Sequence, residues 1–137
     1  MIWALSGSMR EAALDAMALL LPVTCVGCGL RDRAVCAACR VALSAATRLV
    51  ERPRLGAAWA GLEYSGEVAA AIGAFKDGGR TDAAAALARA LGAAIEAALA
   101  GWPSGSVEVC TIPSTPAAMR SRGYAPVELL LARRGIR

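Results

Sequence analysis

Histidine is absent from this 137-residue sequence, and Lys76 is the only lysine among its 15 basic residues. The missing imidazole excludes Ser-His-Asp and Cys-His catalysis, and any histidine-ligated metal, within this chain. Long apolar runs are missing too, because the longest, Met17–Leu21, is far shorter than the ~20 residues that cross a membrane. Acidic Glu11 and Asp15 interrupt the apolar stretch that a secretory signal needs. The sequence therefore predicts a cytoplasmic protein without a transmembrane segment.

Hydrophobic residues make up 57% of the sequence and charged residues 19%, a balance that argues against intrinsic disorder. The length suits one modest domain with a small appendage. The net charge is +4, and the dominant arginine can bind phosphate through its two-pronged guanidinium. Codon bias in a GC-rich genome produces the same excess of arginine over lysine. The charge alone therefore says little about partners.

Three regions are expected along the chain. Residues 1–22 are predicted to form an N-terminal amphipathic helix that begins at a capping box, Ser8–Glu11. Residues 23–52 hold a cysteine knuckle and a short helix that runs to about Val50. Residues 53–137 alternate strand and helix patterns, as the front half of an α/β domain does.

The third region opens after a linker predicted at Glu51–Gly56. Its β-branched run Val107–Ile112 is typical of a buried parallel strand, in which Cys110 is a small core residue. The full set of expected elements is a strand Ala57–Tyr64, a helix from Glu67 to Gly78-Gly79, a helix capped by Asp82 with a stripe of Leu87, Leu91, Ile95 and Leu99, the strand Val107–Ile112, a loop Pro113–Gly123 and a helix Val127–Arg134 opened by Pro126.

Four of the five cysteines form two Cys-x2-Cys pairs, Cys25 with Cys28 and Cys36 with Cys39. Each pair can direct two thiolates at one ion, and Gly27 supplies the permissive backbone of a tight knuckle. In a reducing compartment this spacing predicts one Zn²⁺ held by all four sulfurs, a closed site with a structural role. Two disulfides, an iron–sulfur site and unconnected buried thiols are the alternatives.

Short motifs follow one another in a fixed order along the chain. The motifs are Leu-Leu-Leu-Pro before the knuckle, the four cysteines, Tyr64-Ser65-Gly66, Phe75-Lys76-Asp77-Gly78-Gly79-Arg80, Ile112-Pro113-Ser114 and Arg120-Ser121-Arg122-Gly123-Tyr124. In this order the chain resembles the ComF family, whose members are competence protein F-like proteins that join an N-terminal zinc knuckle to a type I phosphoribosyltransferase domain. The resemblance extends from about Leu14 to Arg134 and implies a Rossmannoid α/β domain after the knuckle.

The resemblance implies a phosphate site in the second half of the chain. Ser114 and Thr115 match the loop after the first core strand, whose amides lie near the pyrophosphate. Arg120 and Arg122 match the family's Arg-x-Arg-Gly segment, whose guanidinium groups bind phosphate. Lys76 matches the basic residue before the Gly-rich turn. Exposure to solvent is the alternative for all three basic side chains.

The sequence departs from the family pattern in two places. Many members have Asn-Gln where this chain has Ala125-Pro126. The family's signature, a strand with two acidic residues and a Thr-Thr-Gly turn for the 5-phosphate of phosphoribosyl pyrophosphate, does not occur before Arg137. Asp77–Asp82 follows a predicted helix, so we interpret it as a cap and turn and not as a substitute phosphate loop. We therefore expect an incomplete, truncated phosphoribosyltransferase-like domain without transferase activity of its own.

Two functions are consistent with these residues. A ComF-like protein would be linked to DNA uptake in competence or to nucleotide metabolism, with DNA or competence-machinery proteins as partners and weak affinity for a phosphate-containing ligand. Mg²⁺ and phosphoribosyl pyrophosphate are expected only for a full-length domain, and the incomplete sheet predicts self-association. The alternative is a zinc-dependent module that binds nucleic acid or a partner protein through Arg31, Arg33 and Arg40 and the Arg120/Arg122 loop.

Overall fold

The structure is a computed structural model that describes residues 23–31, 33–54, 56–103 and 105–136. The helix predicted within residues 1–22 lies outside the described residues. In chain order the described elements are α2 (Ala37–Ala42), β1 (Arg48–Arg52), β2 (Gly56–Ala60), α3 (Gly66–Lys76), the short 3₁₀ turn η1 (Thr81–Ala83), α4 (Ala84–Leu99), α5 (Pro116–Arg122) and α6 (Pro126–Arg133).

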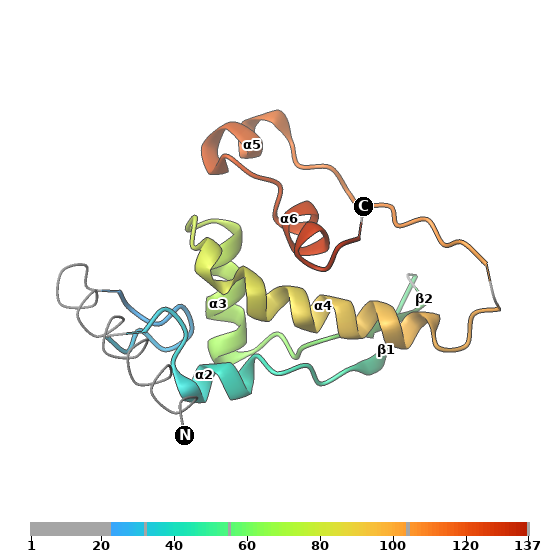
Figure 1. Cartoon of the computed structure of the whole chain (residues 1–137), viewed down its shortest axis with the longest axis horizontal. Helices are drawn as coiled ribbons and strands as arrows, with labels where there is room; N and C mark the ends of the chain where they lie inside the picture. Colours follow the sequence, from blue (N-terminus) through green and yellow to red (C-terminus); the bar gives the residue numbers. More distant parts are fainter. Residues whose placement is uncertain (1–22, 32, 55, 104, 137) are drawn as a thin grey trace, which may run out of the picture.

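Helix α4 is the centre of this arrangement, in contact with α6 and with β2, while α2 packs against α3 (Figure 1). The described part of the chain is thus a mixed structure of helices and one two-stranded antiparallel sheet. A parallel sheet of the kind found in phosphoribosyltransferases is not formed by these residues. The expectation of an α/β domain holds only in the coarser sense that the described chain combines helices with a small sheet.

The hairpin corrects two predictions. Strands β1 and β2 pair antiparallel, with Arg48 opposite Ala60 and Arg52 opposite Gly56. The helix predicted to reach Val50 ends at Ala42 instead. The predicted linker, residues 51–56, includes the end of β1 and the first residue of β2, with the hairpin turn between them. A left-handed backbone at Arg54, with a φ of 71°, reverses the chain there. A weak local preference for helix is therefore outweighed by the backbone hydrogen bonds of a neighbouring strand.

Strand β2 is shorter than the predicted strand, which extended to Tyr64. It ends at Ala60, and the next residue, Gly61, lies directly against the backbone of α4. A Cβ atom at Gly61 would overlap the carbonyl oxygen of Ala90, so only glycine permits this close approach. The glycine therefore fixes the point at which the hairpin meets α4.

The helices predicted after Glu67 and Asp82 are confirmed as α3 and α4. In α3, Glu67 lies in the first turn and Lys76 in the last, an arrangement that complements the helix dipole. Before α4, Oδ1 of Asp82 accepts a hydrogen bond from the amide of Ala83 at 3.1 Å. Asp82 itself lies inside η1, and the N-cap of α4 is Ala83, which makes no side-chain cap hydrogen bond. The helix predicted after Asp82 is therefore confirmed, whereas the predicted cap at Asp82 is wrong.

Alanine forms most of the buried face of α4. In the predicted leucine stripe, Leu87 is buried and Leu91 half-buried, whereas Leu99 is 36% exposed. Small side chains let neighbouring elements approach α4 closely, so the packing surface is wider than the stripe. The core combines the buried residues Val26, Leu43, Val68, Ala71, Phe75, Ala83, Ala84, Ala86 and Leu87.

The segment after α4 departs most from the predictions. Val107–Ile112 is not a strand, because no other strand of the described chain lies beside it to accept its hydrogen bonds. Cys110, predicted as a core residue, is exposed for the same reason. Within the predicted loop Pro113–Gly123, residues Pro116–Arg122 form helix α5. Thr115 caps this helix by accepting a hydrogen bond from the amide of Ala118 at 3.2 Å.

Helix α6 confirms the last predicted helix and packs on α4. Tyr124, just before it, connects this part of the chain to α3. Its ring lies 5.6 Å from the ring of Phe75, centroid to centroid, and its hydroxyl donates a hydrogen bond to the carbonyl oxygen of Phe75. The C-terminal part of the chain is therefore joined to the core at α6 and Tyr124.

Candidate metal centre

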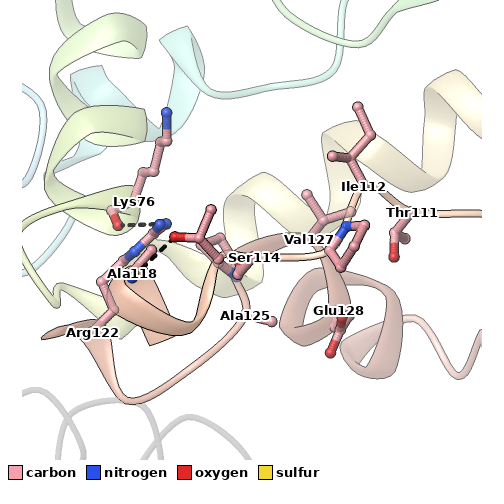
Figure 2. Close-up of a pocket in the computed structure, with 12 residues that line it drawn as sticks. Lys76, Thr111, Ile112, Ser114, Ala118, Arg122, Ala125, Val127 and Glu128 are labelled. Carbon is pink, nitrogen blue, oxygen red and sulfur yellow. Dashed lines mark hydrogen bonds between the residues drawn. The ribbon is translucent and has the colours of Figure 1, made fainter. Parts of the chain in front are cut away.

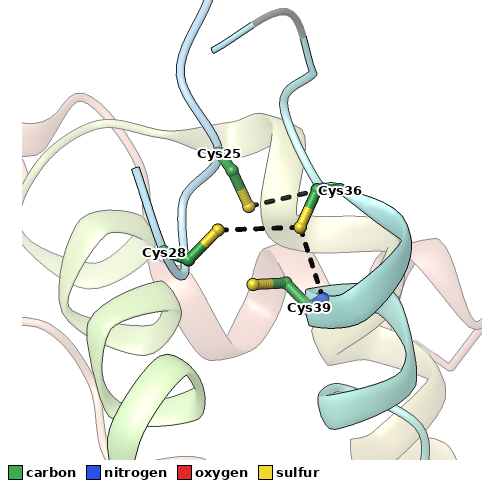
Figure 3. A group of neighbouring side chains, drawn as sticks. All are labelled: Cys25, Cys28, Cys36 and Cys39. Atoms are coloured by element: carbon green, nitrogen blue, oxygen red, sulfur yellow. Dashed lines mark hydrogen bonds between the residues drawn. The ribbon is translucent and has the colours of Figure 1, made fainter. Parts of the chain in front are cut away.

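The four predicted cysteines come together at one point (Figure 3). Cys25 and Cys28 lie on the turn before α2, and Cys36 and Cys39 lie at the start of that helix. All four Sγ atoms lie within 4.8 Å of one another, and those of Cys28 and Cys36 are 3.6 Å apart. Sulfurs arranged tetrahedrally around Zn²⁺ at a bond length of about 2.3 Å are ~3.8 Å apart. The cluster therefore has the dimensions to hold one metal ion.

Local backbone hydrogen bonds shape the first pair of ligands. The amide of Cys25 donates to the carbonyl oxygen of Leu30 at 2.7 Å, and the amide of Gly29 donates back to the carbonyl of Cys25 at 2.9 Å. Gly29 adopts a left-handed φ of 76°, which glycine takes without strain. The tight turn directs both thiols of this pair toward the second pair.

Gly27 is essential to this packing because it leaves room for a ligand. A Cβ atom there would lie 2.7 Å from Sγ of Cys39 and 3.1 Å from Cβ of Glu67. Real Cβ atoms do not approach sulfur that closely, so an added methyl group would displace either the sulfur or helix α3. The sequence indicated the need for glycine here, although the neighbours it meets are visible only in three dimensions.

Helix α2 supplies the second pair of ligands and orients them with its own amides. The amide of Cys36 donates to Sγ of Cys25 at 3.3 Å, and the amide of Cys39 donates to Sγ of Cys36 at 3.4 Å. Amide donors of this kind stabilise negative charge on sulfur. The chain thus favours thiolates at the position where a cation would bind.

The thiols of the cluster differ in their pKa values. Burial raises the pKa of Cys25. Hydrogen bonds outweigh this effect and lower the pKa to about 6; they come from the amides of Cys28, Cys36 and Gly27 and from the thiol of Cys39. Burial, together with the neighbouring thiols, raises the pKa of Cys39. Without a cation, Cys25 therefore ionises more readily than Cys39. A bound divalent cation would permit four thiolates.

The cluster is part of the protein core and not an isolated appendage. Cys25, Cys36 and Cys39 are buried and share Val35 with the main hydrophobic core, whereas Cys28 is exposed. Between Cys25 and Gly27, Val26 belongs to that core as well. The position of the four sulfurs is thus coupled to the packing of α3 and α4.

One arginine, which sequence reasoning did not single out, fastens the knuckle to the start of α4. Nη2 of Arg80 donates to the carbonyl of Thr24 at 2.7 Å and also to the carboxylate of Asp82 at 2.7 Å. The two contacts connect residues that are 56 positions apart in the sequence. The sequence predicted only a helix cap at Asp82, and nothing in it indicated that Arg80 would contact Thr24.

The other arginines of this region have different environments. Arg31 and Arg40 are exposed, whereas Arg33 is half-buried and interacts with another group of the protein. All five cysteines are free thiols, so the disulfide alternative is not what this structure contains. The exposed pair Arg31 and Arg40 is available to a partner, and it is equally compatible with a solvated rim.

Several residues of the predicted phosphate site line a common pocket of about 410 Å³ (Figure 2). Ser114, Thr115 and Arg122 take part in its lining, together with Lys76. Arg120 is exposed and is not among the lining residues. The structure therefore brings three of the four predicted residues together and leaves Arg120 apart.

The pocket is less basic than its residue types suggest. Nη1 of Arg122 donates to the carbonyl oxygen of Lys76 at 3.3 Å, and in Figure 2 the Lys76 ammonium points away from Arg122. Glu128, which the sequence analysis did not single out, adds a carboxylate to the lining. The groups that favour an anion are thus one guanidinium and three hydroxyl-bearing residues, Thr111, Ser114 and Thr115, and Glu128 opposes it.

Among the residues that the structure describes, none of the helices has the length and hydropathy required to cross a bilayer. No protein-family model, no curated protein and no solved structure matches the chain. The resemblance to the ComF family therefore depends on the ordered motifs alone and stays a prediction.

Proposed function

We propose that Cys25, Cys28, Cys36 and Cys39 bind one Zn²⁺ and that this ion has a structural role. The observation that carries the proposal is the convergence of four thiol sulfurs within 4.8 Å, because thiolate ligands in a tetrahedral set favour zinc over harder cations. Four protein ligands leave no coordination position for a substrate, so the ion would stabilise the fold and not catalyse a reaction.

Metal analysis of the protein, purified without added metal, tests this centre. We expect about one zinc per chain, as for a four-thiolate site, and loss of the metal in the variant Cys36→Ser. Cys110→Ser is the matched control, since Cys110 lies outside the cluster, and it should retain zinc fully. Replacement by Co²⁺ should give the absorption of tetrahedral thiolate coordination. Detection of iron and sulfide in place of zinc would show that the cysteines hold an iron–sulfur cluster.

We further propose that the chain is a ComF-like member of the phosphoribosyltransferase family, in which the pocket around Arg122 binds the phosphate of a ligand. The ordered motifs support this relationship, and so does the gathering of Ser114, Thr115 and Arg122 on one pocket. Competence, DNA uptake and nucleotide metabolism are the settings that the family suggests. Transfer of a phosphoribosyl group is not assigned to any residue of this chain.

Titration with pyrophosphate at low salt tests the pocket, and the structure predicts different effects for its two candidate arginines. Arg122→Ala should weaken binding several-fold because a charge-assisted hydrogen bond is lost. Arg120→Ala is the matched control of equal charge change, and it should have little effect because Arg120 does not line the pocket. Glu128→Gln removes the opposing carboxylate and should strengthen binding. If both arginine variants lost the same amount of pyrophosphate affinity, the loss would reflect net charge alone, and the pocket would not be the binding site.

The second candidate function is a zinc-dependent interaction module, favoured by the exposure of Arg31 and Arg40 beside the metal centre. Such a module would bind nucleic acid with an affinity that falls steeply as salt rises. The double variant Arg31→Ala with Arg40→Ala should then lose DNA binding while it retains zinc and pyrophosphate affinity. DNA binding that survives this change would exclude these two arginines as the contact surface.

A further inference from the structure

The segment Val107–Ile112 has the sequence of a strand but none of the hydrogen bonds of one. Within the described residues, no backbone amide or carbonyl of this segment has a hydrogen-bond partner. Val107 is 44% exposed, Val109 41% and Ile112 95%. Figure 1 shows the chain running here as an extended line between the end of α4 and the start of α5. An unpaired strand with exposed β-branched side chains is a template for another strand.

We propose that Val107–Ile112 pairs with the same segment of a second copy of this chain. The two segments would form an antiparallel ribbon around a two-fold axis, with Cys110 opposite Cys110 of the second copy. A self-complementary pair of this kind closes on itself and gives a dimer. The proposal does not depend on the zinc centre. Thr111 and Ile112 also line the pocket around Arg122, so the paired segment and the proposed phosphate site share one edge.

The charge of the segment suits pairing with itself. Glu108 is its only charged residue, and in this register it lies opposite Ile112 of the second copy. The two Glu108 carboxylates are then four residues apart along the ribbon, ~13 Å, which exceeds the screening length of ~8 Å at physiological ionic strength. No like charges face each other, so a second copy is an electrostatically acceptable partner.

The side chains on the other face of the ribbon also match. Val109 lies opposite Thr111 of the second copy, and β-branched pairs of this kind stabilise neighbouring strands. Pro113 has no amide and ends the ladder, so the paired stretch is short. A short two-stranded ribbon is only marginally stable, and we therefore expect a reversible dimer.

An apolar groove of about 360 Å³ adds surface that a second copy can cover. It is lined by side chains of β2, α3, α4 and α6. Val127 lines both this groove and the pocket to which Thr111 and Ile112 belong, and it is 46% exposed. The unpaired segment and the groove are therefore adjacent parts of one uncovered surface.

Sedimentation analysis of the zinc-loaded protein under reducing conditions, over a range of concentrations, tests the dimer. The unaltered chain should shift from monomer to dimer as concentration rises. Val109→Pro removes an amide from the centre of the ribbon and should raise the dissociation constant about tenfold or more. Ser106→Pro is the matched control, since Ser106 lies outside the paired residues and has no backbone hydrogen bond to lose.

Oxidation by diamide tests the register. Two facing Cys110 thiols would pass two electrons and two protons to diamide and form an intermolecular disulfide, which peptide mass analysis locates. Cys110→Ser should abolish this disulfide and leave the reversible dimer unchanged, and Ser106→Cys in that background should not restore it. The proposal is overturned by a chain that stays monomeric, by open-ended assemblies, by a dimer insensitive to Val109→Pro, or by equal cross-linking through Ser106→Cys.

Discussion

Two segments of this chain show that strand character alone does not make a strand. Arg48–Arg52 was predicted as the end of a helix and the start of a linker, yet it forms β1 because β2 lies across from it in register. Val107–Ile112, with its β-branched residues, is the better strand by sequence and remains unpaired. The availability of a partner strand, and not the intrinsic preference of either segment, accounts for the difference.

The same contrast separates two larger regions. In residues 23–100 the cysteine cluster, α3 and α4 are joined by buried side chains, and the hairpin contacts α4 through β2. Long-range hydrogen bonds such as that from Arg80 to Thr24 add to these contacts. Residues 105–114 make no backbone hydrogen bond within the described chain. Stability should therefore be concentrated in the first region, and substitutions in the two regions should have very different consequences.

Removal of the metal should have the largest effect on the difference in stability between the two regions. If zinc is bound as proposed, a chelator leaves several thiols in a confined space next to core residue Val26, and the first region should lose several kcal/mol of stability. Circular dichroism should show a fall of more than about 10 °C in the melting temperature. Added zinc should restore it. In dilute monomer the amides of residues 107–112 should exchange fast in both forms. An unchanged melting temperature would show that the cluster does not support the fold.

Leu43→Ala is expected to have the next largest effect. Leu43 is 2% exposed and connects the end of α2 to the main core, so truncation should cost about 2–4 kcal/mol in transfer energy and cavity formation. Val109→Ala, in the unpaired segment, should change the free energy of unfolding by less than ~0.5 kcal/mol. Urea denaturation of dilute monomer measures both. Equal losses would mean that the segment is packed in solution.

Gly27→Ala tests the packing of the knuckle itself. Its Cβ atom would meet Sγ of Cys39 at 2.7 Å, so we expect a loss of about 1–3 kcal/mol together with weaker zinc binding in a competition assay with a chromophoric chelator. Gly73→Ala is the matched control, because a Cβ in that position of α3 meets nothing within 4 Å. It should stabilise the helix by ~0.5–1 kcal/mol. A Gly27→Ala protein with unaltered zinc affinity would refute the crowding argument.

Features set by local spacing could be predicted from the sequence. The four cysteines are brought together by two tight pairs, and α3 and α4 form where the helical spacing of apolar residues predicts them. Each of these depends on neighbours within a few positions, which a sequence pattern records directly.

Features set by distant partners could not be predicted in this way. The hairpin depends on the pairing register between β1 and β2. The buried face of α4 depends on how closely neighbouring elements can approach its alanines. Cys110 is exposed because the described chain has no strand next to it. Three of the four residues predicted for the phosphate pocket line it. Arg120 lies apart from it because Pro116–Arg122 forms helix α5, where the sequence predicted a loop. Tertiary contacts decide these features, and single-sequence patterns contain little information on them.

Among the substitutions expected to destabilise the core, Tyr124→Phe should have the smallest effect, and its pH dependence distinguishes it from simple packing loss. The hydroxyl of Tyr124 donates to the carbonyl of Phe75, and its removal should cost about 0.5–1.5 kcal/mol at neutral pH. Burial raises the pKa of Tyr124, Asp77 raises it further and Arg122 opposes them. Because the folded pKa lies above the unfolded value of 10.0, the neutral phenol stabilises the fold fully below pH 10, and this contribution is lost as the pH rises through the folded pKa. Parallel urea titrations should therefore show a constant difference between the two proteins up to the unfolded pKa and a shrinking one above it. A difference that stays constant at higher pH would mean that the phenol is not held neutral by the fold.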